Sequence, residues 1–216
     1  MGSCEPSEPI AVAILAKAPV AGTVKTRLIP ALGAEGAAKL HERMIERTVE
    51  TAHAAAIGPV TLWVTPDEPH PYFIAAAERH RIALAHQPNG DLGARMLAAM
   101  APGGHTIVVG TDCPVLMPAQ LRLAAEVLRE VEVVVFPAED GGYVLIGSRQ
   151  PQPALFVGMT WSTEEVMGET RRRLARLSLS WREPATLWDV DRPEDLARLR
   201  KAGLAKLLPA HDQAYR

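Results

Sequence analysis

Three features are scarce in this 216-residue chain, and each scarcity excludes a class of protein. The only two cysteines, Cys4 and Cys113, have neither the spacing of a metal-binding motif nor that of a disulfide framework, so a cytoplasmic location is expected. No uncharged apolar run reaches about 18 residues and no signal-peptide pattern opens the sequence, which predicts a protein without membrane attachment. The 23 Lys and Arg residues nearly balance 25 Asp and Glu residues, so no general attraction for nucleic acid is expected.

The size and apolar content favour one domain. A hydrophobic fraction of 48% in 216 residues suffices for one well-packed core and is small for two. The domain is expected at residues 9–203, between a flexible N-terminal tail at 1–8 and a C-terminal tail at 204–216. The oligomeric state stays open, with a homodimer as one possibility.

Short apolar runs alternate with helix-like stretches along the chain. Most of these runs are apolar at every position, as in strands that are covered on both faces. Strands are expected at residues 10–16, 60–65, 82–86, 106–110, 132–137 and 143–147. Helices are expected at residues 34–56, 72–81, 92–100, 118–130, 163–177 and 193–202. The alternation predicts an α/β fold with a Rossmann-like open, mainly parallel sheet flanked by helices.

Ligands of such sheets gather at the carboxyl ends of the strands, where the loop "LAKAPVAGTVKTRL" at 15–28 follows the first strand. Gly22 can adopt a positive φ that turns backbone N–H groups inward. Lys25 and Arg27 supply positive charge for phosphates, whereas Lys17 is expected to be mostly structural. The loop is not a Walker A motif, because valine rather than glycine precedes "KT". The alternative is a surface loop whose cations are merely solvated.

A second loop, "TDCP" at residues 111–114, follows another expected strand. Asp112 would present a carboxylate at the mouth of the sheet, where it could hold Mg²⁺ against substrate phosphates. It could equally be a turn residue that satisfies nearby backbone amides. Cys113 is interpreted as a space-filling residue, because no histidine lies near it in the sequence to activate it.

Acidic residues gather in two later loops. In "AEDGGY", Glu139 and Asp140 could bind the hydroxyls of a second substrate or act as a base. A tight turn between two strands would explain the glycines there, but not the two adjacent acids. In "DVDRPEDL", Asp191 could cap the following helix together with Glu194, or Asp191 or Asp189 could complete a metal site.

Trp161 precedes a Ser162 and Glu165 pair that is expected to form a capping box. Its ring could stack on a base or a sugar, but packing beside the start of the helix is the favoured interpretation. The histidines are scattered without metal-ligand spacing, which disfavours a zinc site.

Five ordered segments resemble the bacterial family DUF2064, glycosyltransferase-like proteins of the nucleotide-diphosphosugar transferase (GT-A) superfamily. They are "LAKAPVAGTVKTRLIPALG", "GDLGARM", "GTDCPVL", "PAEDGGYVLIG" and "DVDRPEDL". The resemblance implies a GT-A fold and a glycosyltransferase-like enzyme with a nucleotide sugar as donor, a small-molecule acceptor and Mg²⁺ or Mn²⁺ as cofactor. "KTRL" also resembles 2-phospholactate guanylyltransferases, so a nucleotidyltransferase that uses an NTP and releases pyrophosphate is the alternative. A binding module without turnover is a second alternative.

The resemblance also implies roles for individual residues. The metal ligands would be Asp112, Asp191 and Asp189. The nucleotide would contact Ala16, Lys17, Gly22, Lys25, Arg27, Gln87, Gly93 and Thr111. The substrate would contact Gly141, Gly142, Tyr143 and Trp161. Catalytic roles would fall to Lys25, Arg27, Asp140 and Glu139.

Overall fold

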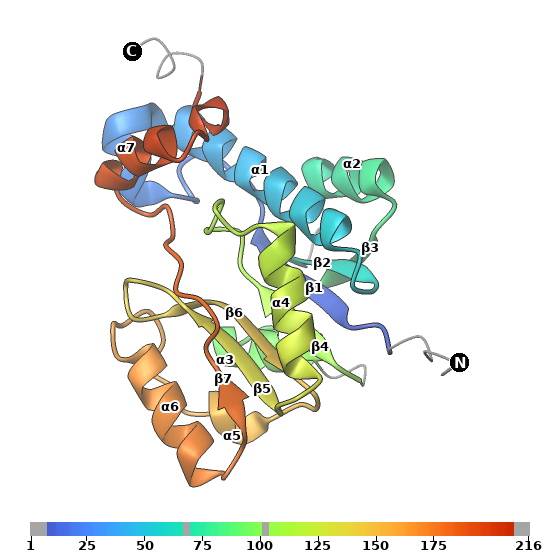
Figure 1. Ribbon diagram of the computed structural model, residues 1–216. Helices are drawn as coiled ribbons and strands as arrows, with labels where there is room; N and C mark the ends of the chain where they lie inside the picture. Colours follow the sequence, from blue (N-terminus) through green and yellow to red (C-terminus); the bar gives the residue numbers. More distant parts are fainter. Residues whose placement is uncertain (1–7, 67–69, 101–103, 210–216) are drawn as a thin grey trace.

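A seven-stranded sheet forms the centre of the computed structural model, which describes residues 8–66, 70–100 and 104–209 (Figure 1). The strands are β1 (Ala11–Lys17), β2 (Val60–Thr65), β3 (Ala83–His86), β4 (Thr106–Val109), β5 (Val133–Pro137), β6 (Tyr143–Ser148) and β7 (Trp181–Arg182). Their order is β3-β2-β1-β4-β6-β5-β7, and only β6 runs antiparallel to its neighbours among these strands. The expected α/β fold with an open, mainly parallel sheet is therefore confirmed.

The reversed strand β6 brings an additional residue to the carboxyl edge of the sheet. Tyr143, the first residue of β6, pairs with Pro137, the last residue of β5. The connecting turn is closed by a 3.0 Å hydrogen bond from the Ala138 amide to the Gly142 carbonyl. Gly141 has a φ of 92°, and a Cβ there would lie 2.1 Å from the Glu164 carbonyl oxygen, so only glycine fits. The expected tight turn is confirmed, and it lies beside the loops that follow β1 and β4.

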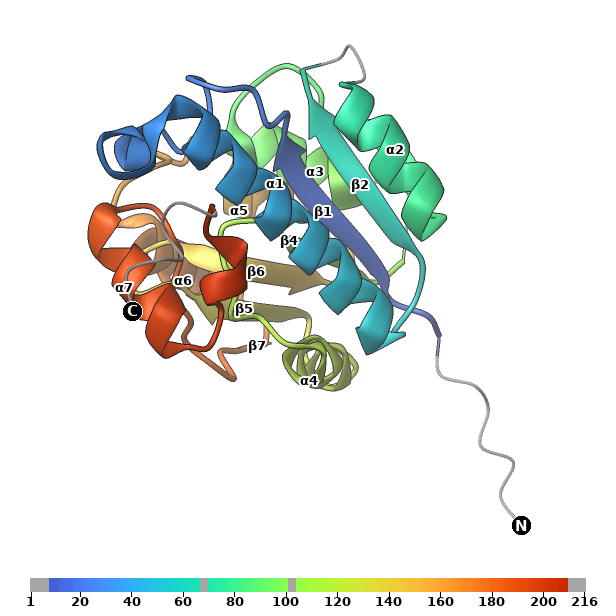
Figure 2. The same ribbon diagram turned by 90° about the horizontal axis from the view of Figure 1, so that it is seen from above.

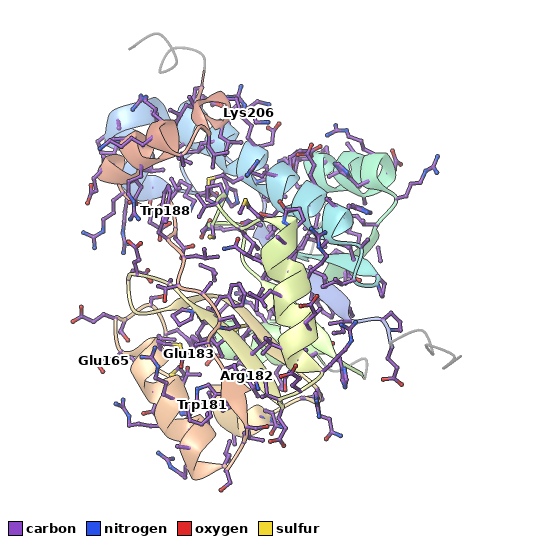
Figure 3. The ribbon with its side chains drawn as sticks, in the orientation of Figure 1. Glu165, Trp181, Arg182, Glu183, Trp188 and Lys206 are labelled. Atoms are coloured by element: carbon purple, nitrogen blue, oxygen red, sulfur yellow. The ribbon has the colours of Figure 1, made fainter. Side chains whose placement is uncertain are left out.

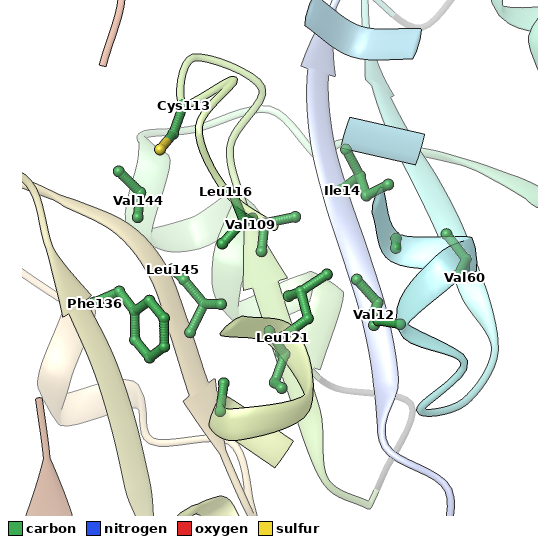
Figure 4. Close-up of a cluster of buried hydrophobic side chains, with 14 of the residues drawn as sticks. Val12, Ile14, Val60, Val109, Cys113, Leu116, Leu121, Phe136, Val144 and Leu145 are labelled. Atoms are coloured by element: carbon green, nitrogen blue, oxygen red, sulfur yellow. The ribbon is translucent and has the colours of Figure 1, made fainter. Parts of the chain in front are cut away.

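Helices cover both faces of the sheet (Figure 2). They are α1 (Ile29–Ala55), α2 (Pro71–His80), α3 (Leu92–Met100), α4 (Pro118–Leu128), α5 (Pro153–Phe156), α6 (Val166–Arg176) and α7 (Pro193–Lys201), with short 3-10 turns η1 (Thr26–Leu28) and η2 (Ala205–Leu207). Helices α1, α2 and α4 pack on one face, and α3, α5 and α6 pack on the other. Figure 4 shows part of the first core, where Leu121 of α4 lies among side chains of neighbouring strands.

Two expected capping arrangements are wrong. Ser162 has a φ of 64° and α6 begins only at Val166, so Ser162 and Glu165 form no capping box. At α7, the carboxylate of Asp195 accepts hydrogen bonds from the amides of Asp191 (3.0 Å) and Arg192 (2.8 Å). Asp195 therefore accepts the hydrogen bonds of the backbone amides at the start of α7, and the Asp191 side chain is available for other contacts.

The packed part of the chain continues past residue 203, where the domain was expected to end. Leu204, Leu207 and Leu208 join the apolar cluster that holds α7 against the first half of α1. Arg43 of α1 donates hydrogen bonds to carbonyls of this segment, including that of Leu208. Residues 210–216 and 1–7 of the expected tails, including Cys4, lie outside the described residues. Within the described ranges, no helix is both long enough and apolar enough to cross a membrane.

Candidate functional site

Two adjoining compartments open at the carboxyl edge of the sheet. The wide compartment has a volume of about 730 Å³, and the narrow compartment has a volume of about 300 Å³. Residues that border both are Lys17, His41, Leu92, Asp112, Tyr143 and Asp189. The loops that follow β1 and β4 and the start of β6 thus meet around one cleft, as the topology predicts.

Lys25 is the centre of an ion-paired cluster in the wide compartment. Its Nζ lies 2.6 Å from Asp112 Oδ1 and 2.7 Å from Asp191 Oδ1, and it donates a 2.8 Å hydrogen bond to the Val190 carbonyl. The Lys25 side chain is only 5% exposed, against 45% for Asp112 and 39% for Asp191. Burial acts to lower the pKa of Lys25, but attraction to the two carboxylates outweighs it and the pKa is raised. The structure thus brings together three expected site residues.

The two acids reach Lys25 from segments far apart in the sequence. Asp112 follows β4, and Asp191 precedes α7. The Val190 amide donates a 2.8 Å hydrogen bond to the Asp112 carbonyl, which fixes the two segments side by side. Burial would raise the pKa of Asp112, yet the adjacent Lys25 ammonium lowers it, so this carboxylate is ionised at neutral pH.

Asp189 borders both compartments in a more acidic environment. Burial raises its pKa to about 8, and the negative charges of Asp112, Asp191 and Asp140 contribute to the same shift. Lys25 opposes the shift but does not cancel it. Two carboxylates therefore pair with one ammonium group, with Asp189 and Asp140 nearby, and the cluster favours additional positive charge.

The expected metal ligands fit a hard cation only in part. Carboxylate oxygens are the donors that Mg²⁺ and Mn²⁺ prefer, and Mg²⁺ commonly uses one or two of them with water and phosphate oxygens. Asp112 and Asp191 converge on one point, but Lys25 Nζ lies there. Among the described residues, no three acidic, histidine or cysteine side chains are grouped to hold a metal. Asp189 is close enough to Asp112 and Asp191 to feel their charge, but does not complete such a group.

The other charged residues of the 15–28 segment differ in whether their side chains are free to bind a ligand. Lys17 Nζ donates a 2.8 Å hydrogen bond to the Thr23 carbonyl, which agrees with the mostly structural role expected for it. Gly22 adopts a φ of 81° in the same turn, as expected. Arg27 is exposed and borders the wide compartment, and its guanidinium group has no hydrogen-bond or ion-pair partner in the described part of the chain. Arg27 is therefore free to bind an anion.

The narrow compartment contains four of the residues expected to contact the nucleotide: Ala16, Lys17, Gln87 and Thr111. Gln87 Nε2 donates hydrogen bonds to the carbonyls of Ala16 (3.1 Å) and Trp63 (2.8 Å), which orient this buried side chain. Gly93 borders neither compartment. A Cβ at Gly93 would lie 2.8 Å from the Trp161 ring, so close packing rather than ligand contact explains this glycine.

The turn between β5 and β6 contributes Asp140, Gly142 and Tyr143 to the wide compartment. Asp140 Oδ1 accepts a 3.0 Å hydrogen bond from the Gly142 amide. Gly141 borders neither compartment, and its carbonyl accepts a 2.8 Å hydrogen bond from the Met167 amide. Gly141 thus fixes the turn against α6, while its neighbours face the cleft.

Glu139 lies outside both compartments, so the structure does not support its expected catalytic role. Its carboxylate accepts hydrogen bonds from Arg198 Nη1 (2.8 Å) and Nη2 (2.9 Å) of α7. The Arg198 guanidinium lies 4.3 Å from the centre of the Trp188 ring. Trp188 is beside α7 in Figure 3. Glu139 therefore ties the β5–β6 turn to α7.

Trp161 and Tyr143 form one wall of the cleft. Their ring centres are 6.4 Å apart at an interplanar angle of 84°, an edge-to-face arrangement. Trp161 packs against the core that includes α3, in agreement with the favoured interpretation, and also borders the wide compartment. Burial raises the pKa of Tyr143, whose hydroxyl lies 3.7 Å from Met96 Sδ.

The polar residues of the cleft that sequence reasoning missed include His41 and Arg95. His41 is 5% exposed on α1, and its Nε2 is 2.9 Å from the Lys17 carbonyl, whereas its buried Nδ1 has no partner among the described residues. Burial lowers the pKa of His41, which favours the neutral ring. Arg95 borders the narrow compartment, and its Nε is also buried without a partner in the described chain. For His41, a signal was available in the sequence. His41 lies four residues from both Ala37 and Ile45, so it shares the apolar face of the helix, where a polar side chain is unusual.

Solved structures share this fold. A "putative nucleotide-diphospho-sugar transferase" from Desulfovibrio desulfuricans G20 is 27% identical, with a TM-score of 0.78 over 84% of this chain and 82% of that chain. A nucleotidyl transferase from Methanothermobacter thermautotroptrophicus has a TM-score of 0.67 at 15% identity, over 92% of this chain and 100% of its own. Glucosyl-3-phosphoglycerate synthase from Mycobacterium tuberculosis, in complex with Mn²⁺ and UDP, has a TM-score of 0.55 at 12% identity, over 93% of this chain and 78% of its own. These neighbours agree with the expected transferase fold.

The family comparison identifies the chain. A comparison with curated proteins finds no match. The family described as "Uncharacterized protein conserved in bacteria (DUF2064)" matches residues 48–163, more than half of the chain. The matched segment includes Asp112 and Asp140, but neither Lys25 nor Asp191. The protein belongs to the DUF2064 family and has the fold of the nucleotide-diphospho-sugar transferases.

Proposed function

We propose that the protein is a transferase that moves a sugar from a nucleotide sugar to a small-molecule acceptor with the help of Mg²⁺ or Mn²⁺. The observation that carries this proposal is the pair of compartments that share Asp112 and Asp189. A narrow, largely apolar compartment suits a base and a ribose, and a wide, charged one suits a diphosphate, a sugar and an acceptor. The expected location in the cytoplasm, the homodimer and the absence of nucleic-acid partners stay predictions.

The donor would span the two compartments. Gln87, Thr111 and Arg95 offer polar groups to the nucleoside in the narrow compartment. The phosphates would bind Arg27, whose guanidinium group has no partner among the described residues, and Lys25 once its ammonium leaves the acids. Asp112 with Asp191 or Asp189 would hold the divalent cation, which when bound neutralises charge on the departing nucleoside diphosphate.

The acceptor would bind in the wide compartment beside Asp140, Tyr143 and Trp161. Asp140 would take the proton of the acceptor hydroxyl as this oxygen forms a bond to the anomeric carbon. The bond from the anomeric carbon to the donor phosphate breaks, and its electron pair leaves with the nucleoside diphosphate. Arg27 stabilises the negative charge that develops there.

A nucleotidyl transfer is the second candidate, because the nucleotidyl transferase from Methanothermobacter shares the fold over its whole length. In that reaction the same cations would face the α-phosphate and the departing pyrophosphate of an NTP, and an acceptor phosphate or hydroxyl would attack. A binding protein without turnover would keep the ligand contacts and release neither product.

A thermal-shift panel of NTPs and nucleotide sugars, each with and without Mg²⁺, tests the proposal first. We expect a Mg²⁺-dependent rise in Tm with one nucleotide sugar, followed by release of a nucleoside diphosphate when an acceptor is added. A shift with one NTP and release of pyrophosphate would favour the second candidate. If no nucleotide shifts Tm under any metal condition, the proposal is wrong.

A further inference from the structure

We infer that Lys25 and a divalent cation compete for the same two carboxylates, so that metal and donor phosphates bind cooperatively. The inference rests on the proposed function and adds that the affinity for the metal depends on whether the donor phosphates are bound. Metal alone would bind weakly, because it must displace an internal ammonium group. Phosphate groups would favour metal binding, because they give that ammonium a new partner.

The geometry around Lys25 Nζ supports the competition. Three oxygen atoms converge on it: Asp112 Oδ1 at 2.6 Å, Asp191 Oδ1 at 2.7 Å and the Val190 carbonyl at 2.8 Å. Converging carboxylate and carbonyl oxygens are also what a hard divalent cation requires. An ammonium group and a divalent cation cannot occupy one set of oxygens, because they would repel strongly at such short range in a partly buried site.

The surroundings of Lys25 provide a second position for its ammonium group. Lys25 itself borders the wide compartment, as does Arg27 two residues later. The backbone of Lys25 is fixed by a 2.8 Å hydrogen bond from the Leu28 amide to its carbonyl, so a side-chain rotation is enough to move Nζ away from the acids. A diphosphate beside Arg27 would accept hydrogen bonds from the displaced ammonium.

Local charge explains why the exchange is driven by both ligands together. Lys25 is the one ammonium group that pairs with Asp112 and Asp191 in the described structure, and the carboxylate of Asp140 lines the same compartment. Metal without phosphate would leave a 5% exposed ammonium group with no acidic partner and next to a divalent cation. Phosphate without metal would compete with the two aspartates for Lys25. Each ligand therefore increases the affinity for the other.

Titration with Mn²⁺ alone, followed by the electron paramagnetic resonance signal of free Mn²⁺, tests the competition. We expect Lys25→Met to bind Mn²⁺ on the order of tenfold more tightly than the wild type, because the internal competitor is gone. Lys39→Met is the control: it also removes one ammonium group, but Lys39 pairs with Glu42 on α1 and borders neither compartment. Its Mn²⁺ affinity should stay close to that of the wild type. Equal or weaker Mn²⁺ binding by Lys25→Met would overturn the inference.

The chemical reactivity of lysines in the wild-type protein gives a second test, which does not depend on any variant folding correctly. Lys25 should react slowly with a small acylating reagent, whereas Lys39, whose side chain is 50% exposed, should react quickly. Mn²⁺ should accelerate acylation of Lys25 and leave Lys39 unchanged, and inorganic pyrophosphate added with Mn²⁺ should slow Lys25 again. Unchanged Lys25 reactivity at saturating Mn²⁺ would contradict the inference.

The two proposals can fail separately. If a nucleotide and Mg²⁺ raise Tm together but neither test shows competition at Lys25, the transferase proposal stands and the competition is wrong. If Lys25→Met binds Mn²⁺ more tightly but no nucleotide binds any variant, the competition stands and the donor assignment is wrong.

Discussion

The buried charged groups of the wide and the narrow compartments differ in whether the protein supplies them with a partner. In the wide compartment, Lys25 pairs with both Asp112 and Asp191 within the protein. In the narrow compartment, Arg95 Nε is buried without a partner among the described residues, as is Nδ1 of His41, which borders both compartments. A buried polar group without a partner is costly, whereas a paired group must first be released before it can bind a ligand. The wide compartment therefore has to rearrange, while the narrow one offers unused polar atoms.

The largest effect is expected at Asp112, which borders both compartments. Asp112→Asn removes a charge that pairs with Lys25 and that would hold the divalent cation. We expect metal-dependent nucleotide turnover to fall by at least about 100-fold, because charge stabilisation of the leaving group is lost. Product release measured in Mg²⁺ checks this. Unchanged turnover in a folded Asp112→Asn variant would remove Asp112 from the site.

Arg27 tests the wide compartment alone. Arg27→Met should weaken binding of inorganic pyrophosphate and of a nucleotide to the same extent, about tenfold, because one charged hydrogen-bond donor to phosphate is lost. Isothermal titration calorimetry in Mg²⁺ measures both affinities. Arg122→Met is the control, since Arg122 bonds to the Ala54 carbonyl and borders neither compartment. Equal affinities in Arg27→Met and the wild type would contradict a phosphate role.

Arg95 tests the narrow compartment, where a substitution should affect the nucleoside and not the phosphates. Arg95→Met should weaken nucleotide binding several-fold, by roughly one hydrogen bond, and leave pyrophosphate binding unchanged. The same calorimetry separates the two effects. An equal loss for both ligands would show that the compartments do not divide nucleoside from phosphates.

Asp189 gives a pH-dependent stability effect. Its pKa is raised from 3.8 to about 8 in the folded protein, so the folded state binds more protons than the unfolded state between these values. The stabilisation from neutral Asp189 is complete below pH 3.8 and is lost as the pH rises through about 8. Asp189→Asn should therefore gain in Tm over the wild type progressively from pH 5 to pH 8. A difference in Tm that is constant with pH would contradict the raised pKa.

The smallest effect is expected outside both compartments, at Glu139. Its pair with Arg198 is about half exposed, so Glu139→Gln should lower the free energy of unfolding by less than about 1 kcal/mol. Nucleotide turnover should stay near the wild-type rate. A strong loss of turnover at unchanged Tm would restore the catalytic role that the sequence suggested.

Local patterns were enough to predict most of the fold. The apolar runs of β1, β2 and β4 and the turn at Gly141 and Gly142 depend on neighbouring residues, and these elements lie close to their expected bounds. The topology of parallel sheets then placed Lys25 and Asp112 at one edge. The two-residue strand β7 was missed, because it is too short to show a periodic pattern.

The contacts of single side chains could not be predicted in this way. The pairs of Lys25 with Asp191 and of Glu139 with Arg198 join segments that are distant in the sequence. Their partners are decided by packing, because each of these charges would be equally acceptable in solvent. His41 was missed for the same reason, since a helix pattern does not show which buried side chain reaches a cleft.

The segment from β7 to α7 has a consequence for synthesis of the protein. It is fastened by hydrogen bonds from the Leu187 amide to the Pro137 carbonyl (2.9 Å) and from the Val190 amide to the Asp112 carbonyl (2.8 Å). Figure 3 shows it running from Trp181 at β7 to Trp188 near α7. A nascent chain that has passed Asp112 but not Asp191 holds Lys25 without one of its two acids. The site is therefore completed only when the segment that precedes α7 has left the ribosome.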